Sequence, residues 1–329
     1  MASSFSLLPP LSSTLPGSDM VSFILIRHGE SKDNLRQVWA GWKNSPLSNH
    51  GNITHYIWCH KADFKVVGMR QAEALADDFC RMNVAFSAIY TSDLTRAKLT
   101  AQAVNDKQAA TADIPFVEMD LLREQNFGSG EGRAISKKEK GISLVAHYAK
   151  GKYPALHTRQ QKFPGGESLD EMAQRAEAIV NGIISLELLK EKDESKTRTV
   201  AIVSHGLFIG ELVAAIVRRD VDFQGNLDVR DLRGMRNTGW TRLEVSLKPD
   251  SGDRRLSSDT SSNAQTSPAL VVRLNEINRY SHLSNLHRQK GGIGSSTHDP
   301  AQQDIRSFLA GKQKSALAAS NLAPKSKPY

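Results

Sequence analysis

Cysteine and long apolar runs are both scarce in this sequence. Its 329 residues include two cysteines, Cys59 and Cys80, so a framework of several disulfide bonds is excluded and a reducing compartment is acceptable. No apolar run approaches the roughly 20 residues that a membrane-spanning helix requires. Residues 1–20 lack the lysine and arginine that secretory and mitochondrial targeting segments carry. We therefore expect a cytoplasmic protein that has no membrane partner.

Positive charge is in moderate excess and unevenly distributed. The formal net charge is +8, and residues 248–329 carry twelve Lys and Arg against six Asp and Glu. Neither an aromatic-basic stripe nor a zinc-finger spacing accompanies this charge. A solvated tail is therefore favoured over a nucleic-acid-binding surface, and we expect no nucleic-acid partner.

Short apolar segments alternate with segments of helical spacing along the chain. This pattern predicts an α/β fold, a three-layer α/β/α sandwich around a mostly parallel sheet. The segment Ser168–Glu171 matches a capping box at the start of the longest helix. Residues 240–247 and 270–277 alternate as edge strands do. The other predicted strands are 21–26, 88–90 and 199–203, and the predicted helices are 72–79, 94–104, 169–183 and 207–218.

Composition divides the chain into one domain with flanking segments. We expect a disordered N-terminal extension over 1–20, a single domain over 21–310 and a disordered basic tail over 311–329. Within the domain, residues 249–269 are rich in Ser, Asp, Thr and Asn and have almost no core-forming residue, so they are predicted to form a flexible loop.

The strongest chemical signal directly follows the first predicted strand. It is the motif Arg27-His28-Gly29-Glu30-Ser31, with Asn34 six residues after His28. Residues at the carboxyl end of a parallel strand line the ligand crevice of an open α/β sheet. An arginine there can bind two phosphate oxygens, and its charge disfavours protonation of His28, which keeps the imidazole nucleophilic. We expect Gly29 to let the main chain approach a ligand closely.

Three more motifs supply polar side chains of complementary kinds. His205 follows the strand 199–203, and the amides of Gly206 and Leu207 are expected to face a bound anion. Arg96 lies shortly after the strand 88–90, and Glu124 lies in a loop. Two histidines, two arginines and a glutamate fit phosphoryl transfer, which needs fixed donors around phosphorus, an in-line nucleophile and an acid for the leaving oxygen.

The order of these motifs resembles the histidine phosphatase superfamily, also called phosphoglycerate mutase-like. The motifs are RHGE with Asn34, SDLTRA at 92–97, REQNFG at 123–128, FPGGES at 163–168 and VSHG at 203–206. The resemblance covers residues 22–247 and extends to the segment 270–283. It implies a phosphoglycerate mutase-like fold and a phosphatase acting on a small phosphorylated metabolite, with no cofactor and no metal.

The resemblance also implies a role for each residue. His28 attacks phosphorus and becomes phosphohistidine, while Glu124 protonates the leaving alcohol and later takes a proton from water. The residues implied to hold the phosphoryl oxygens are Arg27, Arg96 and the catalytic His205, with Asn34 assisting, and those implied to contact the rest of the substrate are Ala40 and Gly41. Gly206, at the predicted helix start, is the further phosphate-binding residue that we expect. Asn34 and Glu124 also have a plain structural reading, on a helix surface and in an exposed loop.

Two other functions are alternatives to the phosphatase. A cofactor-dependent phosphoglycerate mutase must hold a second phosphate, but Gln125, not a second arginine, follows Glu124. A non-catalytic module that binds phospho-ligands is the alternative from another class, and a homodimer is open in either case.

One segment departs from the family pattern. Residues 46–51 and 69–72 match it, but Asn52–Gly68 between them do not. The segment is either a surface insertion or an unspliced in-frame intron, because removal of these 17 residues restores the pattern. His50, His55, Cys59 and His60 lie in or beside it, and their spacing matches no common zinc site.

Overall fold

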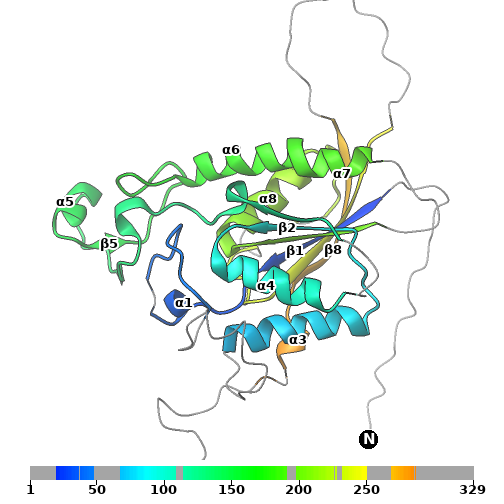
Figure 1. Cartoon of the computed structure of the whole chain (residues 1–329). Helices are drawn as coiled ribbons and strands as arrows, with labels where there is room; N and C mark the ends of the chain where they lie inside the picture. Colours follow the sequence, from blue (N-terminus) through cyan, green and yellow to red (C-terminus); the bar gives the residue numbers. More distant parts are fainter. Residues whose placement is uncertain are drawn as a thin grey trace, which may run out of the picture. The chain divides into compact units, whose positions relative to one another are not determined.

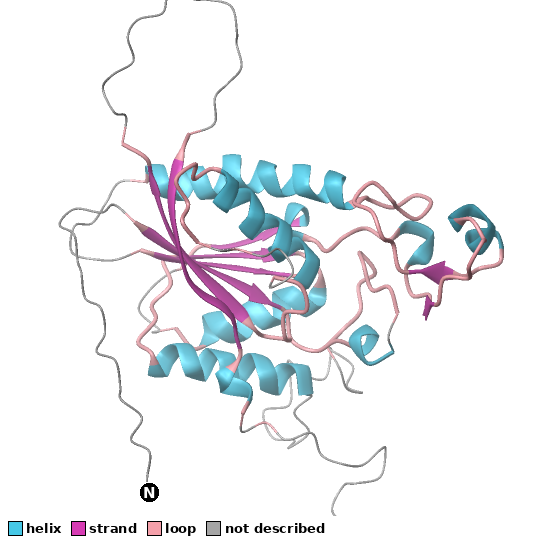
Figure 2. Ribbon diagram, turned by 180° about the vertical axis from the view of Figure 1, so that it is seen from behind, coloured by secondary structure: helices cyan, strands magenta, loops and turns pink. Residues whose placement is uncertain are grey.

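A computed structural model describes residues 20–36, 38–47, 67–108, 114–190, 198–225, 227, 232–249, 268–284 and 286. Six strands form one sheet in the order β3-β2-β6-β1-β7-β8 (Figures 1 and 2). The first four of these strands run parallel, and β7 is antiparallel to both β1 and β8. The strands are β1 (Val21–Arg27), β2 (Ala88–Ser92), β3 (Phe116–Met119), β6 (Thr199–Ser204), β7 (Trp240–Leu247) and β8 (Leu270–Arg279).

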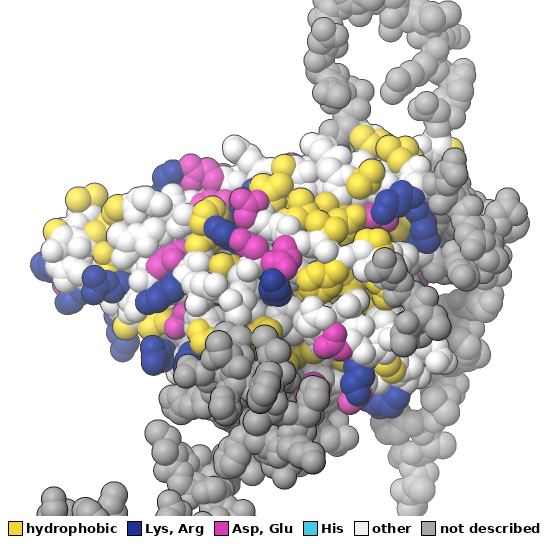
Figure 3. All heavy atoms as spheres, in the orientation of Figure 1, with side chains coloured by type: hydrophobic (Ala, Val, Ile, Leu, Met, Phe, Trp, Pro, Cys, Tyr) yellow, Lys and Arg dark blue, Asp and Glu magenta, His cyan; other side chains and the backbone are white. Residues whose placement is uncertain are grey.

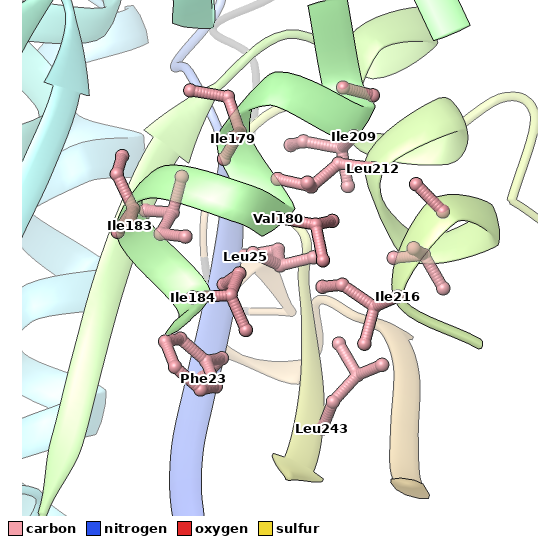
Figure 4. Packing of buried hydrophobic residues seen from close by; sticks show 14 of the residues in the cluster. Phe23, Leu25, Ile179, Val180, Ile183, Ile184, Ile209, Leu212, Ile216 and Leu243 are labelled. Atoms are coloured by element: carbon pink, nitrogen blue, oxygen red, sulfur yellow. The ribbon is translucent and has the colours of Figure 1, made fainter. Parts of the chain in front are cut away.

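Strand β1 is apolar on both faces because helices cover the sheet on both sides. Phe23 and Leu25 pack into one cluster, and Ile24 and Ile26 pack into another. Figure 4 shows the first cluster, in which Ile209 lies among other buried aliphatic side chains. The helices that contribute to this first cluster are α6 (Leu169–Ile179), the π-helix η3 (Val180–Ile184), α7 (Ser185–Leu189) and α8 (Gly206–Arg218). The helices that contribute to the second cluster, with Ile24 and Ile26, are α3 (Val67–Arg81) and α4 (Thr95–Asp106).

The predicted three-layer sandwich around a mostly parallel sheet is therefore confirmed. The capping box of α6 is also present, since the Ser168 hydroxyl accepts from the Glu171 amide and the Glu171 carboxylate accepts from the Ser168 amide. One strand assignment was wrong, because β7 lies inside the sheet. Polar and apolar residues alternate along β7 because of residues such as Arg242, whose Nε donates to the Ser22 hydroxyl of the neighbouring strand β1 at 2.9 Å. The second edge strand is β3, whose four residues are too few for a pattern to reveal.

An arm, defined here as residues 131–163, projects from one end of the sheet (Figure 1). It carries β4 (Ile135–Ser136), α5 (Leu144–Ala149) and β5 (Tyr153–Pro154). Lys and Arg side chains gather at this end of the molecule (Figure 3). The remaining short elements are α1 (Lys32–Arg36), η1 (Asp120–Leu122), η2 (Gly128–Gly130) and η4 (Ser281–Leu283).

The segment 52–68 ends inside helix α3. Residues 52–66 lie outside the described residues, but Val67 and Gly68 form the first turn of this helix. A Cβ on Gly68 would lie 2.3 Å from the Glu30 carbonyl oxygen, and one on Gly29 would lie 2.4 Å from the Gly68 carbonyl oxygen. The close approach that requires Gly29 is thus to α3. Removal of the 17 residues would leave Gly51 before Met69, so a glycine would precede Met69 in either form of the chain.

The other predicted segments fall mostly outside the described residues. These are the N-terminal extension up to residue 19, loop residues 250–267 and everything after residue 286, including the predicted basic tail and the end of the predicted domain. Within the described ranges, no helix is long and apolar enough to cross a membrane.

Candidate active site

The two predicted histidines meet because their strands are neighbours. Strands β1 and β6 pair in parallel with Arg27 opposite Ser204, so His28 and His205 leave the sheet at the same edge. Their ring centroids are 5.0 Å apart, with 58° between the ring planes. Both side chains are buried, at 4% and 0% exposed. The carboxyl ends of two adjacent parallel strands therefore form the centre of the site, as expected for an open α/β sheet.

The hydrogen bond of His28 assigns its tautomer. Nδ1 lies 2.7 Å from the Gly29 carbonyl oxygen, which can only accept, so Nδ1 carries the hydrogen and Nε2 is the unprotonated nitrogen of the neutral ring. Burial lowers the pKa of His28 well below its usual value, and the positive charges of Arg96 and Arg27 lower it further. The ring is therefore neutral at neutral pH, which is the form that a nucleophile requires.

His205 is held in the opposite tautomer. Arg96 Nε, which can only donate, lies 3.3 Å from Nδ1, and Nε2 lies 3.0 Å from the Ser92 hydroxyl. Nε2 therefore carries the hydrogen and donates to Ser92. Burial, followed by the charge of Arg96, lowers the pKa of His205 well below its usual value. Both ring nitrogens have protein partners, so a phosphoryl oxygen would have to replace one of them.

The guanidinium of Arg96 is buried and bonded on three sides. Besides His205, it donates from Nη1 to the Lys43 carbonyl at 2.9 Å and from Nη2 to the Gly41 carbonyl at 2.7 Å. Burial lowers the pKa of Arg96 to about 10, while Glu124 acts in the opposite direction. The side chain is still a cation at neutral pH, so the site contains a fixed positive charge.

The predicted substrate contacts Ala40 and Gly41 belong to the turn that holds Arg96. Gly41 has φ +47°, and a Cβ there would lie 2.4 Å from Oε1 of Glu131, so only glycine fits. Ala40 accepts a hydrogen bond from the Lys43 amide at 3.2 Å within the same turn. These two residues therefore have a clear positioning role in the structure, through the carbonyl that Gly41 offers to Arg96.

Arg27 contributes a buried donor. Its Nη1 donates to the Met235 carbonyl, whereas its Nε has no partner among the described residues. A Cβ on Gly206 would lie 3.5 Å from this Nε, so the unpaired donor lies beside the start of α8. Burial lowers the pKa of Arg27, and Glu124 opposes this effect. Buried polar groups in proteins are nearly always paired, so an orphan guanidinium N–H beside a helix N-terminus suits an anionic ligand.

Glu124 occupies the N-terminus of α8. Its Oε2 accepts from the Leu207 amide at 3.2 Å, and its Oε1 accepts from the amides of Phe208 at 3.2 Å and Gln125 at 3.0 Å. The Leu207 amide, which was expected to face a bound anion, therefore bonds a carboxylate of the chain itself. The free amides of a helix N-terminus suit carboxyl oxygens as acceptors. Glu124 thus lies at the start of the helix that follows His205, close enough to Arg27 and Arg96 to oppose the effect of burial on the pKa of both arginines.

Asn34 is tied to a turn that the sequence did not reveal. Its Oδ1 accepts from the Ser31 amide at 2.9 Å and from Nδ2 of Asn237 at 3.3 Å. Nδ2 of Asn237 also donates to the His28 carbonyl at 3.1 Å, and the Thr238 amide donates to the Arg27 carbonyl at 3.0 Å. The turn before β7 therefore fixes the main chain of the nucleophile motif. The turn-forming sequence Asn237-Thr238-Gly239 at a strand start is the one signal that could have predicted it.

Among the described residues, no group of three or more His, Cys, Asp and Glu side chains is placed to hold a metal ion. The histidines and cysteine weighed for a zinc site, which are His50, His55, Cys59 and His60, lie outside the described residues.

Comparison with known proteins decides the family. Residues 57–249, more than half of the chain, match the model of the histidine phosphatase superfamily (branch 1). The chain belongs to this superfamily. The matched residues include Arg96, Glu124 and His205, while Arg27 and His28 precede them. The predicted resemblance is therefore confirmed.

Relatives within the histidine phosphatase superfamily include phosphatases and mutases. The chain is 24% identical over 301 residues to fructose-2,6-bisphosphatase TIGAR of Xenopus tropicalis, covering 80% of this chain and 94% of that protein. It is 28% identical over 208 residues to the uncharacterized phosphatase PhoE of Bacillus subtilis, covering 62% and 82%. It is 26% identical over 197 residues to the 2,3-bisphosphoglycerate-dependent phosphoglycerate mutase of Brucella anthropi, covering 59% and 81%.

A solved phosphatase structure supports the fold. Mycobacterial glucosyl-3-phosphoglycerate phosphatase in complex with VO3 has a TM-score of 0.51 and 21% sequence identity, with 78% of this chain and 98% of that chain covered. The phosphoglycerate mutase-like fold is thus shown.

Proposed function

We propose that this protein is a phosphomonoesterase that acts on a small phosphorylated metabolite through a phosphohistidine at His28. The observation that carries the proposal is the state of His28. It is a buried neutral imidazole whose Nδ1–H is bonded to the Gly29 carbonyl, with Arg96 and Arg27 close enough for their charges to add to the lowering of its pKa by burial. Transfer of a phosphoryl group to a histidine requires an unprotonated ring nitrogen beside fixed positive charge.

In the first step, the lone pair of His28 Nε2 attacks phosphorus and the bond between phosphorus and the ester oxygen breaks. Glu124 in its acid form gives its proton to the leaving oxygen, so the alcohol departs neutral. The product is a phosphohistidine whose Nδ1–H keeps its bond to the Gly29 carbonyl. Arg27 and Arg96, with His205, Asn34 and the start of α8 at Gly206, stabilise the charge on the phosphoryl oxygens.

In the second step, a water molecule attacks phosphorus and Glu124, now a carboxylate, takes its proton. The bond from Nε2 to phosphorus breaks, and inorganic phosphate leaves with His28 restored as a neutral ring. Glu124 is bonded to the amides of Leu207 and Phe208 as the structure stands. Contact with the leaving oxygen therefore requires one carboxylate oxygen to exchange an amide for the substrate, and the released amide becomes a donor for phosphate.

A phosphatase is favoured over a mutase by the residue after the acid. A mutase needs cations for a second phosphate, and this position is held by Gln125, which is buried and donates from Nε2 to the Glu167 carbonyl at 2.7 Å. Lys137 and Lys138 are the nearest lysines downstream, and both lie exposed on the arm. Low cysteine content supports the further proposal of a cytoplasmic location, which cell fractionation can check.

Hydrolysis of a generic phosphomonoester without added metal tests the proposed function. We expect turnover by the wild type and a loss of at least about 10⁴-fold in kcat for His28→Ala, because the nucleophile is removed. His157→Ala is the matched control, since His157 is exposed on the arm, and it should keep wild-type activity. Absence of turnover by the folded wild type on a broad panel of phosphate esters would favour the phospho-ligand-binding module.

A further inference from the structure

A cavity of about 180 Å³ lies beside the candidate active site. Three of its lining residues are sequence neighbours of site residues. Gly206 follows His205, Gln125 follows Glu124, and Trp39 precedes Ala40. Leu207 also lines the cavity, and its amide donates to Oε2 of Glu124 at 3.2 Å. The cavity therefore adjoins the carboxyl group proposed to protonate the leaving oxygen, which is where the alcohol part of a phosphate ester would lie.

The walls of this cavity are mainly apolar. The indole N–H of Trp39 donates to the Tyr153 carbonyl at 2.9 Å, so this ring has no free donor to offer a ligand. Trp39 also packs against Phe127, with ring centroids 4.7 Å apart. The large apolar residues lining the cavity are Trp39, Phe127, Leu156, Leu169, Leu207 and Leu232. Such a surface favours a ligand group that gains from leaving water.

Charge in the cavity is low and largely internally balanced. Two charged side chains line the cavity among the described residues, and one of them, Glu211, is 5% exposed and accepts hydrogen bonds from both terminal nitrogens of Arg159, at 2.9 and 2.8 Å. Arg233 is the other, and it is exposed. A second phosphate group or a carboxylate in the ligand would require several fixed cations, and the described part of the lining provides one arginine against one carboxylate.

We infer that the substrate is a phosphate monoester whose leaving group is an uncharged, largely apolar alcohol about the size of a six-membered ring, bound in this cavity. This inference rests on the proposed function. An apolar protein cavity of roughly 150 Å³ holds a benzene molecule, so a space of this size accommodates one ring. Esters with a second phosphate or a carboxylate on the leaving group are then poor substrates.

Gly210 offers a way to fill the cavity without unfolding the protein. It lies on α8 and lines the cavity, and a Cβ there would be 3.6 Å from Leu232 Cβ, an ordinary contact distance. Gly210→Val therefore places a side chain in the cavity. Gly182→Val is the matched control, since Gly182 also lies in a helical segment and a Cβ there would meet nothing within 4 Å.

The experiment compares kcat/KM for four phosphate esters. Ethyl and cyclohexyl phosphate release alcohols of similar pKa, so their ratio reports on contacts with the leaving group. We expect cyclohexyl phosphate to be favoured by roughly 100-fold, because four additional carbon atoms leave water. Gly210→Val should reduce this ratio by about 10-fold, whereas Gly182→Val should leave it unchanged. Two anionic esters, 3-phosphoglycerate and fructose 2,6-bisphosphate, should be turned over less well than cyclohexyl phosphate.

The outcomes separate this inference from the proposed function. Turnover that depends on His28 but favours an anionic ester over cyclohexyl phosphate would overturn the inference and leave the phosphatase intact. Equal changes in the ratio of cyclohexyl to ethyl phosphate turnover in Gly210→Val and Gly182→Val would also overturn the inference and leave the phosphatase intact. Absence of turnover on all four esters would overturn both.

Discussion

Arg96 Nε lies 3.3 Å from Nδ1 of His205. This contact joins a residue of α4 to the end of β6, 109 positions apart in the sequence. It fixes the tautomer of His205, and the positive charge of Arg96 lowers the pKa of both His28 and His205. One guanidinium thus helps keep two buried imidazoles neutral while its other nitrogens hold the turn at Gly41.

Arg96→Lys should therefore impair activity although it keeps the charge. A lysine ammonium is a point donor that cannot reach His205, Gly41 and Lys43 together from one fork. We expect kcat/KM to fall by roughly 10²- to 10³-fold, the usual cost of losing a fixed donor at the reacting centre. Arg218→Lys, in an exposed ion pair with Glu177, is the control and should behave as wild type. Activity of Arg96→Lys within about threefold of wild type would remove Arg96 from the mechanism.

Glu124→Gln should separate substrates by the pKa of their leaving groups. Glutamine keeps the shape of the side chain but has no proton to give, so esters of alkyl alcohols should lose roughly 10²- to 10⁴-fold in kcat/KM. p-Nitrophenyl phosphate, whose leaving group departs as an anion, should lose much less. Equal losses on both kinds of ester would mean that Glu124 caps α8 and does not act as the acid.

Acid stability should depend on His282. Its Nε2 lies 2.9 Å from the Thr238 hydroxyl, which itself donates to the Asn237 carbonyl, so Nε2 carries the hydrogen and the buried Nδ1 has no partner among the described residues. Burial lowers the pKa of His282 to about 4, Asp78 acts against this effect, and Arg279 and Arg81 add to it. The unfolded chain, with a histidine pKa of about 6.5, therefore binds this proton first.

The sign of the effect follows from this difference. The stability that neutral His282 contributes is fully present above about pH 6.5 and is lost as the pH falls toward 4. The free energy of unfolding should fall by roughly 2 kcal/mol between pH 7 and pH 5 from this residue. Urea unfolding of His282→Gln at both pH values should give a smaller fall than in wild type, because this histidine is gone. Some fall should remain, because His28 and His205, whose pKa values are also lowered, are still present. An identical fall in the two proteins would contradict the assignment.

The sequence predicted the residues of the site better than the residues that hold them in place. Arg27, His28 and His205 directly follow apolar strands, so local pattern alone placed them at one sheet edge. The contact of Asn237 with His28 joins residues 209 positions apart, and no local pattern encodes such a pairing. Likewise, Gly41 was expected to touch substrate because family resemblance gives a position but not its partner, which is Arg96. The interior place of β7 was missed because hydrogen-bonded polar residues alternate like solvent-facing ones.

The most direct test of the proposed mechanism is mass spectrometry of the protein quenched in alkali during turnover of a phosphomonoester without added metal. Phosphohistidine survives alkali, so the peptide that contains His28 should carry one phosphate at the imidazole, and the signal should vanish in His28→Ala. Steady turnover with no phosphate on His28, or with phosphate on another residue, would contradict the assignment of His28 as the nucleophile.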